Sequence, residues 1–493
     1  MKPQVTAMRS LVRGRLTALQ IGGKDVGFVE QEQVPVAVAS MNLENASSIE
    51  AGRQFPAEFL WGSATSSYQI EGAVTEDGRS ESIWDRFCTI PGAIEDGTDG
   101  AVACDHYHLY NDDIALMARL NLNAYRFSIA WPRILPTGRG RANTAGLDFY
   151  DRLVDALLAA GIQPFPTLYH WDLPQVLEDQ GGWPVRSTAE AFADYAEVVA
   201  GRLGDRIDNW MTLNEPYVSA NLGYLTGQHA PGRSSLSDSL AAAHHLLVGH
   251  GLAMERVRAA VPGADVGIVL NFTPVTPIGS SPAALDRQRI VDDVHNHWYS
   301  DPIGGFGYPQ STAERLGWAQ DEVRDGDMEL IARPIDMLGI NFYTRQMVGA
   351  LDGERESRGA QTAMGWEISP PTLGNLLRDL HTVHRFPRFL ITENGAAMPD
   401  VDRVDGRIID HDRLEYIAAH LGQMHQAMED GVPVGGSFAW SLLDHVEWAH
   451  GYGPKFGLVE VDSDTQRRTP KQSALWYAEV AESGEIQPRR DML

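Results

Sequence analysis

From residue 54 onward, short runs of apolar and β-branched residues alternate with longer stretches that have a helical apolar spacing. Each run ends in polar residues, Pro or Gly, as a buried strand does where it meets a loop. The pattern therefore predicts strands separated by helices. The eight predicted strands are 59–63, 124–131, 164–170, 209–214, 266–271, 337–343, 389–393 and 436–440.

Between these runs, apolar residues recur at intervals of three and four positions, which is typical of one buried helix face. In three stretches the pattern stops just before a glycine, a residue that often follows a helix end. Strands alternating with helices predict an α/β protein with a (β/α)8 barrel, in one domain with long loops after the strands. The three stretches are Leu147, Tyr150, Val154, Leu157 and Leu158 before Gly161; Phe192, Tyr195, Val199 and Leu203 before Gly204; and Leu414, Ile417, Leu421, Met424 and Met428 before Gly431.

Residues 1–53 do not follow this alternation. Basic residues occur there with no acidic residue before Asp25, and the segment weakly resembles a transit peptide. We favour a disordered N-terminal extension, and a chain that starts at Met41 is an alternative. The expected organisation is an extension over 1–53, a barrel over 54–483 and a C-terminal tail over 484–493.

The composition excludes several classes of function. A formal net charge of −26 over 493 residues argues against binding to nucleic acid and mildly against a strongly anionic substrate, although solubility alone also explains it. No stretch reaches the ~18 unbroken apolar residues of a membrane helix. Two cysteines, Cys88 and Cys104, are too few for a disulfide framework. A bridge between them stays open, but we favour a reduced pair in a cytoplasmic protein.

Two glutamates stand at the ends of the fourth and seventh predicted strands. Glu215 lies in the phrase TLNEP (212–216) and Glu393 in ITENG (391–395). Two carboxylates that flank one glycosidic bond can break it, and barrel enzymes carry their active sites at the carboxyl ends of the strands. A lone glutamate would instead be interpreted as a surface ion-pair partner. The residues at or just past a predicted strand end are Gln69, Arg126, His170, Asn214, Glu215, Asn271, Tyr343, Glu393 and Trp440.

These two phrases resemble the acid/base and nucleophile motifs of glycoside hydrolase family 1, the β-glucosidase family. Five further phrases agree with the family in the family's order, and the resemblance covers roughly residues 54–480. It implies a retaining mechanism and no cofactor. The five phrases are FLWGSATSSYQIEG (59–72), YRFSIAWPR (125–133), YHWDLP (169–174), NFY (341–343) and WSLLD (440–444).

The resemblance also implies roles for single residues. Glu393 matches the nucleophile and Glu215 the acid/base. Arg126 and Tyr343 match positions that contact the nucleophile, where a guanidinium is expected to lower the pKa of Glu393. The charge of Glu393 is in turn expected to raise the pKa of Glu215. The matches to sugar-binding positions are Gln69, His170, Asn214, Trp440, Glu447 and Trp448, and Trp366 matches a position on the leaving-group side.

The tryptophans and histidines divide into structural and functional candidates. Sugar stacking is expected for Trp440 and Trp448. Several pairs of nearby histidines could indicate a metal site. None of these clusters has the spacing of a known zinc motif, so we expect hydrogen-bonded polar residues in large loops and no metal site. Core packing is expected for Trp61, Trp84, Trp131 and Trp171, and the histidine clusters are His106 with His108, His244 with His245, and His295 with His297.

The chain departs from the family pattern in two places. His445 and Val446 stand before Glu447 where the family usually has Asn and Phe, and Lys455 precedes Phe456 where Arg is frequent. The reaction is expected to be unchanged, whereas the sugar preference stays open.

We therefore expect a cytoplasmic β-glucosidase that acts on small β-glucosides or cello-oligosaccharides and also on β-galactosides or β-fucosides. No nucleic-acid or membrane partner is expected, and the oligomeric state is open, with a homo-oligomer as one option. Three alternatives share most of these residues. They are a phospho-β-glycosidase, a transglycosidase and a catalytically inactive sugar-binding barrel.

Overall fold

The computed structural model describes residues 7–9, 16–21, 24–26, 52–351, 359–400 and 402–487. Eight parallel strands close into a barrel, and each lies where the apolar runs predict it. One strand is shorter than expected because Trp131 and Pro132 begin a short helix directly after it. In chain order the barrel strands are β4 (Leu60–Ala64), β5 (Ala124–Ser128), β6 (Gln163–Tyr169), β7 (Asn209–Asn214), β8 (Asp265–Phe272), β10 (Met337–Phe342), β12 (Phe389–Asn394) and β15 (Val434–Trp440).

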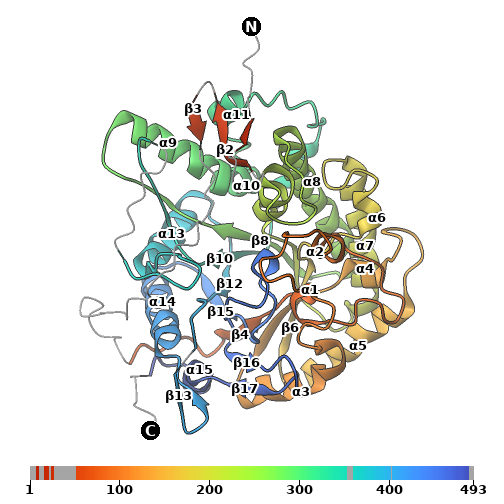
Figure 1. Ribbon diagram of the computed structural model, residues 1–493, viewed down its shortest axis with the longest axis vertical. Helices are drawn as coiled ribbons and strands as arrows, with labels where there is room; N and C mark the ends of the chain where they lie inside the picture. The colour runs from red at the N-terminus through yellow and green to blue at the C-terminus, as the bar shows by residue number, and fades with distance from the viewer. Residues whose placement is uncertain are drawn as a thin grey trace.

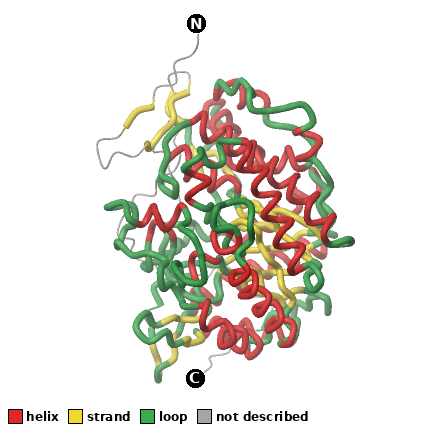
Figure 2. Tube along the Cα trace, turned by 90° about the vertical axis from the view of Figure 1, so that its right-hand side faces the viewer, coloured by secondary structure: helices red, strands yellow, loops and turns green. Residues whose placement is uncertain are grey.

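The strands are buried on both faces, which is why they read as continuous apolar runs. Side chains that point inward fill the barrel and form a core cluster separate from the outer one, with Phe165 and Phe438 packed edge to face at 5.3 Å. The outward side chains pack against the surrounding helices. Both views show the strands in the centre of the molecule with helices around them (Figures 1 and 2).

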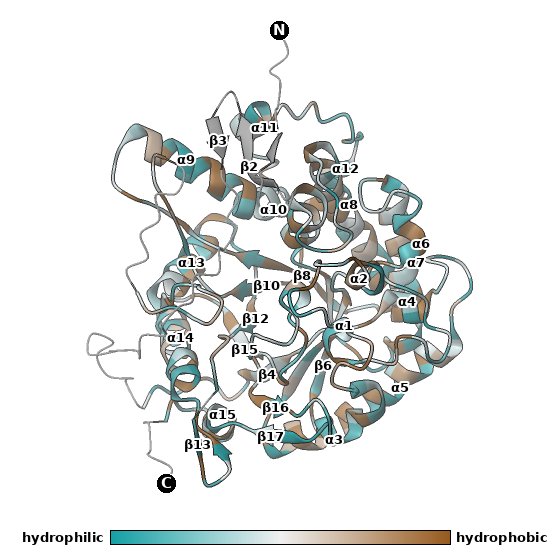
Figure 3. Ribbon diagram, in the orientation of Figure 1, coloured by the Kyte–Doolittle hydropathy of each residue, from teal (hydrophilic) through white to brown (hydrophobic). Residues whose placement is uncertain are grey.

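The helices present an apolar face to the barrel and a polar face to solvent, as the mixed colours of α5 and α14 show (Figure 3). In α5, Leu157 is fully buried, whereas Leu158 is 41% exposed and does not belong to the buried face. Adjacent residues lie about 100° apart on a helix, so only one of the two leucines can point inward. Gly161 and Gly431 have φ of 74° and 90°, the left-handed conformation expected after a helix.

Helices alternate with the barrel strands and are supplemented by short turns in the loops. The helices are α1 (Ser67–Ile70), α2 (Ile83–Cys88), α3 (His106–Arg119), α4 (Trp131–Ile134), α5 (Thr144–Ala159), α6 (Gln175–Glu178), α7 (Arg186–Leu203), α8 (Leu236–Ala260), α9 (Pro282–Asp292), α10 (Trp298–Ile303), α11 (Gln310–Leu316), α12 (Asp327–Ile331), α13 (Pro370–Val383), α14 (His411–Glu429) and α15 (Gln472–Ser483). The π-helical turns η2 (Val218–Thr226) and η3 (Asp293–His297) and the 3-10 turn η4 (Trp448–His450) complete the set.

Three short strand pairs are formed by the loops that follow the barrel strands, within the described residues. They are β9 (Val275–Pro277) with β11 (Gln346–Val348), β13 (Arg403–Val404) with β14 (Arg407–Ile408), and β16 (Val459–Val461) with β17 (Arg468–Pro470). Cys88 and Cys104 are both free thiols, in line with the expected reduced pair. Within the described ranges, every helix is too short or too polar to cross a membrane.

The N-terminal segment contains three short strands, β1 (Ala7–Arg9), β2 (Leu16–Ile21) and β3 (Lys24–Val26), which pair as an antiparallel sheet. The rest of residues 1–51 lies outside the described residues. The disordered extension and the proposed domain boundaries therefore stay predictions. The amide of Gly52 donates to the carbonyl of Ile486 over 3.3 Å, which joins the segment before β4 to the C-terminal end of the described chain.

Candidate active site

Glu393 lies at the carboxyl end of β12 in a buried set of hydrogen bonds. The Arg126 guanidinium donates from Nη1 to Oε1 of Glu393 over 2.6 Å, and the Tyr343 hydroxyl donates to Oε2 over 2.6 Å. Arg126 is fully buried and Glu393 is 3% exposed. Both oxygens of this carboxylate are thus held by strong donors from β5 and from the end of β10, as the family match predicts.

The phrase around Glu393 requires a glycine for a steric reason. A Cβ atom on Gly395 would lie 1.8 Å from the carbonyl oxygen of Trp440, which ends the neighbouring strand β15. Only glycine therefore allows the ends of β12 and β15 to approach this closely. The close approach places Trp440 beside the strand end that carries Glu393.

Glu215 follows β7 in a strained backbone conformation. Its φ is 46°, in the left-handed region, and its amide donates to the carbonyl of Val269 in β8 over 2.9 Å. A non-glycine residue in this region costs on the order of 1–3 kcal/mol and is found most often at functional sites. The turn directs the Glu215 carboxyl to the Asn341 amide, whose Nδ2 donates to Oε1 over 2.5 Å.

Asn341 lies next to both glutamates, a position that the sequence interpretation missed. Its Nδ2 also donates to Oδ1 of Asn214 over 3.1 Å, and its register partner on β12 is Glu393. The same Asn214 oxygen accepts from Nη2 of Arg126 over 2.6 Å. Glu215 and Glu393 therefore face one shared polar cluster. Asn341 stands two residues before Tyr343 on the same inward face of β10, a spacing that could have indicated it.

The two glutamates differ in their tendency to hold a proton. Burial and the charge of Glu393 raise the pKa of Glu215 well above its usual range. Burial also raises the pKa of Glu393, and Arg126 and the Tyr343 hydroxyl oppose that rise. The expected lowering of the pKa of Glu393 by Arg126 is therefore outweighed by burial. Because the pKa of Glu215 is raised well above its usual range and the rise in the pKa of Glu393 is opposed by two donors, a shared proton resides on Glu215 and the charge on Glu393.

Gln69 and Glu447 are hydrogen-bonded to each other at the barrel mouth. Nε2 of Gln69 donates to Oε2 of Glu447 over 3.3 Å and to the carbonyl of Val446 over 2.9 Å, and it lies 3.0 Å from Nδ1 of His445. Ser66 donates to Oε1 of Gln69 over 2.6 Å. Burial and the charge of Glu393 raise the pKa of Glu447 to about 8. His445, where the chain departs from the family pattern, thus contacts a predicted sugar-binding residue directly.

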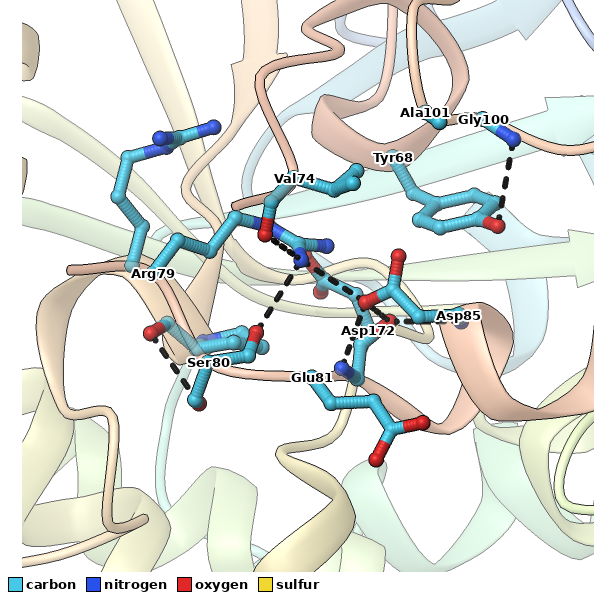
Figure 4. A network of polar contacts seen from close by, with 12 residues as sticks. Tyr68, Val74, Arg79, Ser80, Glu81, Asp85, Gly100, Ala101 and Asp172 are labelled. Carbon is cyan, nitrogen blue, oxygen red and sulfur yellow. Dashed lines mark hydrogen bonds and ion pairs between the residues drawn. The ribbon is translucent and has the colours of Figure 1, made fainter. Parts of the chain in front are cut away.

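The loop that follows α1, the helix that carries Gln69, is held by the buried Arg79 (Figure 4). Nη1 of Arg79 donates to the carbonyls of Val74 and Ser80, each over 3.1 Å, and to Oδ2 of Asp85 over 2.8 Å. Tyr68, the neighbour of Gln69, accepts a hydrogen bond from the amide of Gly100 over 3.4 Å. These contacts hold the loop that follows α1 and join α1 itself to Gly100.

His170 lies between the polar cluster and the tryptophans. Asn214 donates from Nδ2 to Nε2 of His170 over 3.1 Å, which requires a neutral acceptor nitrogen. Burial and the charge of Arg126 keep the pKa of His170 well below its usual range, so the ring is neutral. The ring is stacked on those of Trp440 and Trp448 at 5.8 and 5.9 Å.

Most of the tryptophans named above are buried, and Trp366 is partly buried. Trp61, Trp84, Trp131 and Trp171 all belong to the large core cluster, with exposures of at most 8%, as expected for core packing. Trp448 contacts Trp84 and Trp171, each at 4.6 Å between rings, and so joins this core to the site. Trp366 packs on Tyr343 at 5.3 Å, at the mouth.

One residue predicted at a strand end, Asn271, bonds to a histidine of η3. Asn271, at the end of β8, bonds through Nδ2 to Nε2 of His295 over 3.1 Å, and His295 stacks on Tyr217 at 3.8 Å. Two of the other histidines are bonded in helices, which corrects the expectation of loop positions. His106 in α3 bonds to Asp113 over 2.8 Å, and His244 in α8 bonds to Asp327 over 3.0 Å.

Comparison with known proteins agrees with this geometry. The family model "Glycosyl hydrolase family 1" matches residues 51–486. The chain is similar to β-glucosidase A of Thermotoga maritima, with 42% identity over 88% of this chain and 99% of that protein. It is also similar to a bifunctional β-D-glucosidase/β-D-fucosidase of Bifidobacterium breve, with 42% identity over 86% of this chain and 97% of that protein.

The fold has a similarly close match among solved structures. The β-glucosidase from Thermotoga maritima in complex with glucoimidazole aligns with a TM-score of 0.84 and 43% identity, over 88% of this chain and 99% of that one. The matches in sequence and in structure span the whole barrel. This chain therefore belongs to glycosyl hydrolase family 1.

Proposed function

We propose that this chain is a retaining β-glucosidase that hydrolyses terminal non-reducing β-D-glucosyl residues, with Glu393 as nucleophile and Glu215 as acid/base. The observation that carries the proposal is the pair of buried glutamates in one polar cluster, where Arg126 donates to Glu393 and Asn341 donates to Glu215. The names of the relatives support β-glucosides as substrates and extend the proposal to β-fucosides.

In the first displacement, Glu393 acts as the charged carboxylate and Glu215 as the protonated acid. The charged Glu393 attacks the anomeric carbon, and the bond from that carbon to the leaving oxygen breaks. Glu215, whose pKa is raised, gives its proton to that oxygen. Arg126 and Tyr343 hold both oxygens of Glu393, so that the carboxylate is oriented before the sugar binds.

The second displacement depends on the change in the pKa of Glu215 when Glu393 loses its charge. Once Glu393 is an ester to the sugar, its charge no longer raises the pKa of Glu215, so the pKa falls. Glu215 is then an anion, takes a proton from water, and the hydroxide oxygen attacks the anomeric carbon from the opposite face. The released sugar keeps its β configuration, and Glu393 returns as a carboxylate.

The sugar is held by the polar residues around the mouth. The proposed sugar-binding groups are the amides of Gln69 and Asn214, the neutral His170 and the carboxyl of Glu447. The 2-hydroxyl is assigned to Asn214, where contacts strengthen in the transition state. Trp440 and Trp448 are proposed to flank the ring, and Trp366 to line the leaving-group side.

Among the alternatives, a phospho-β-glycosidase is disfavoured by Glu447. The Glu447 carboxyl can hydrogen-bond the hydroxyls of a neutral sugar, and in its charged form, above its pKa of about 8, it repels a phosphate. Next to it, Phe456 is an apolar residue that is 1% exposed, and His445 is neutral because burial lowers its pKa to about 4. A transglycosidase would use the same residues with another acceptor. Cello-oligosaccharides as natural substrates, a homo-oligomer and a cytoplasmic location stay predictions.

A panel of nitrophenyl β-glycosides tests the proposal. We expect hydrolysis of the glucoside, with lower rates on the fucoside and galactoside and none on the 6-phosphoglucoside. Hydrolysis in plain buffer also separates a hydrolase from a strict transglycosidase. Preference for the 6-phosphate substrate, or no turnover of any member, would contradict the proposal.

A further inference from the structure

The strand pairing between β10 and β12 becomes irregular next to the nucleophile. The parallel register runs from Leu338 with Phe389 to Ile340 with Ile391, and then shifts so that Asn341 pairs with Glu393. The register ends at this pair. The carbonyl groups of Phe342 and Tyr343 lie beyond it and need other donors, because buried carbonyls are almost always hydrogen-bonded.

Two side chains supply these donors. Asn394, the residue after the nucleophile, donates from Nδ2 to the carbonyl of Phe342 over 2.8 Å and to the hydroxyl of Tyr416 over 3.1 Å. Tyr416, on α14, donates from that hydroxyl to the carbonyl of Tyr343 over 3.1 Å. Asn394 and Tyr416 thus replace the missing strand pairing and join the end of β10 to the end of β12.

Tyr416 is itself held rigidly. It is fully buried, its ring packs on that of His420 at 4.0 Å, and Nδ1 of His420 bonds to its backbone carbonyl over 2.7 Å. Burial raises the pKa of its hydroxyl, so the proton that is donated to Tyr343 stays in place. The hydroxyl is therefore a fixed donor, whose position is set by α14.

We propose that Tyr416 is a positioning residue of the reaction: it holds the backbone of Tyr343 so that the Tyr343 hydroxyl points at Glu393. The inference rests on the proposed function, because its effect passes through the nucleophile. The Tyr343 hydroxyl lies 2.6 Å from Oε2 of Glu393 and favours the charged carboxylate. Loss of the Tyr416 hydroxyl therefore weakens this bond without removing any group that touches the sugar.

The test is Tyr416→Phe in the full chain, compared with Tyr477→Phe. Tyr477 is the matched control because it is equally buried and its hydroxyl bonds the carbonyls of Gly62 and Ser437 over 3.2 and 3.0 Å, away from both glutamates. We expect Tyr416→Phe to lower kcat/KM on nitrophenyl β-glucoside about three- to tenfold, the equivalent of one neutral hydrogen bond. The acidic limb of its pH profile should also move upward, by about half a pH unit.

A double-mutant cycle distinguishes positioning from general destabilisation. If Tyr416 acts through Tyr343, then Tyr416→Phe should add little to the loss already caused by Tyr343→Phe, whereas Tyr477→Phe should be additive. Asn394→Ala, which removes the donor to Tyr416, should shift the acidic limb in the same direction and serves if Tyr416→Phe does not fold.

Each outcome supports or overturns the inference. An active wild-type enzyme in which Tyr416→Phe has an unchanged pH profile, or is fully additive with Tyr343→Phe, overturns it and leaves the proposed function intact. An inactive wild-type enzyme overturns the proposed function instead.

Discussion

Arg126 and Glu393 form an ion pair with 2.6 Å between Nη1 and Oε1, in which both side chains are at most 4% exposed. The guanidinium also donates to Asn214, so one planar group holds the proposed nucleophile and a proposed sugar-binding amide together. A lysine has a single charged nitrogen and cannot reproduce this geometry.

We therefore predict that Arg126→Lys lowers kcat/KM at least about a hundredfold, because breaking a buried pair costs on the order of 3–5 kcal/mol. Steady-state kinetics and thermal melting measure the loss of activity and of stability. Arg202→Lys is the control, since Arg202 pairs with Asp148 and Asp151 at the surface and is 39% exposed. Equal, small effects of the two substitutions would contradict a central role for Arg126.

The acid/base role of Glu215 predicts a dependence on the leaving group. Glu215→Ala should lose about 10²–10⁴-fold on substrates with poor leaving groups and far less on dinitrophenyl glucoside, which needs little protonation. Added azide should restore turnover and yield a β-glycosyl azide. Equal loss on all leaving groups, without rescue by azide, would exclude this role.

The pH dependence follows from the raised pKa of Glu215. The first displacement needs the protonated acid, so wild-type kcat/KM should fall as the pH rises through that pKa. In Glu215→Ala the basic limb should vanish, which a pH series with dinitrophenyl glucoside measures.

Because of Glu447, we predict that the enzyme prefers neutral sugars to phosphorylated ones. At about 4 Å and an effective dielectric constant near 20, each phosphate charge beside the ionised Glu447 costs on the order of 4 kcal/mol, or roughly a thousandfold in affinity. This penalty applies in full above the pKa of Glu447, which is about 8. Glu447→Ser should lower kcat/KM for glucosides at least about tenfold, since hydrogen bonds to a carboxylate contribute about 1.5–3 kcal/mol each. Unchanged kinetics on nitrophenyl glucoside would show that Glu447 does not bind the sugar.

The N-terminal segment is predicted to be dispensable for catalysis. A chain that starts at Met41 keeps the described contacts of Gly52 with Ile486 and of Phe55 with Gly484. Its activity and melting temperature should equal those of the full chain within error. A fall of many degrees would show that residues 1–40 stabilise the barrel.

The barrel could be predicted from the sequence because its strands are buried on both faces. A strand such as β12 reads as a short apolar run that ends in polar residues, and its end places Glu393 at the carboxyl edge. Three helices, α5, α7 and α14, were predicted from their apolar spacing, although one leucine was assigned to the wrong face. Leu158 shows that spacing alone does not fix which of two adjacent leucines is buried.

The supporting residues could not be predicted in the same way. Tyr416 lies 73 residues from Tyr343 in the sequence, inside an ordinary helix pattern, and only the packing of α14 on the barrel brings the two together. Asn341 lies in the phrase NFY, but its bonds to Asn214 and Glu215 depend on how the barrel brings the ends of β7 and β10 together. The effect of burial on the pKa of Glu393 likewise required the three-dimensional environment.

Covalent trapping of the nucleophile tests the central claim most directly. Incubation with 2,4-dinitrophenyl 2-deoxy-2-fluoro-β-glucoside, followed by peptide mass spectrometry, should show one fluorosugar bound to Glu393, and Glu393→Gln should fold but neither turn over nor become labelled. In parallel, NMR of the first product should show the β-anomer. A label on another residue, or an α-anomer as the first product, would contradict the assignment of Glu393 as the nucleophile of a retaining mechanism.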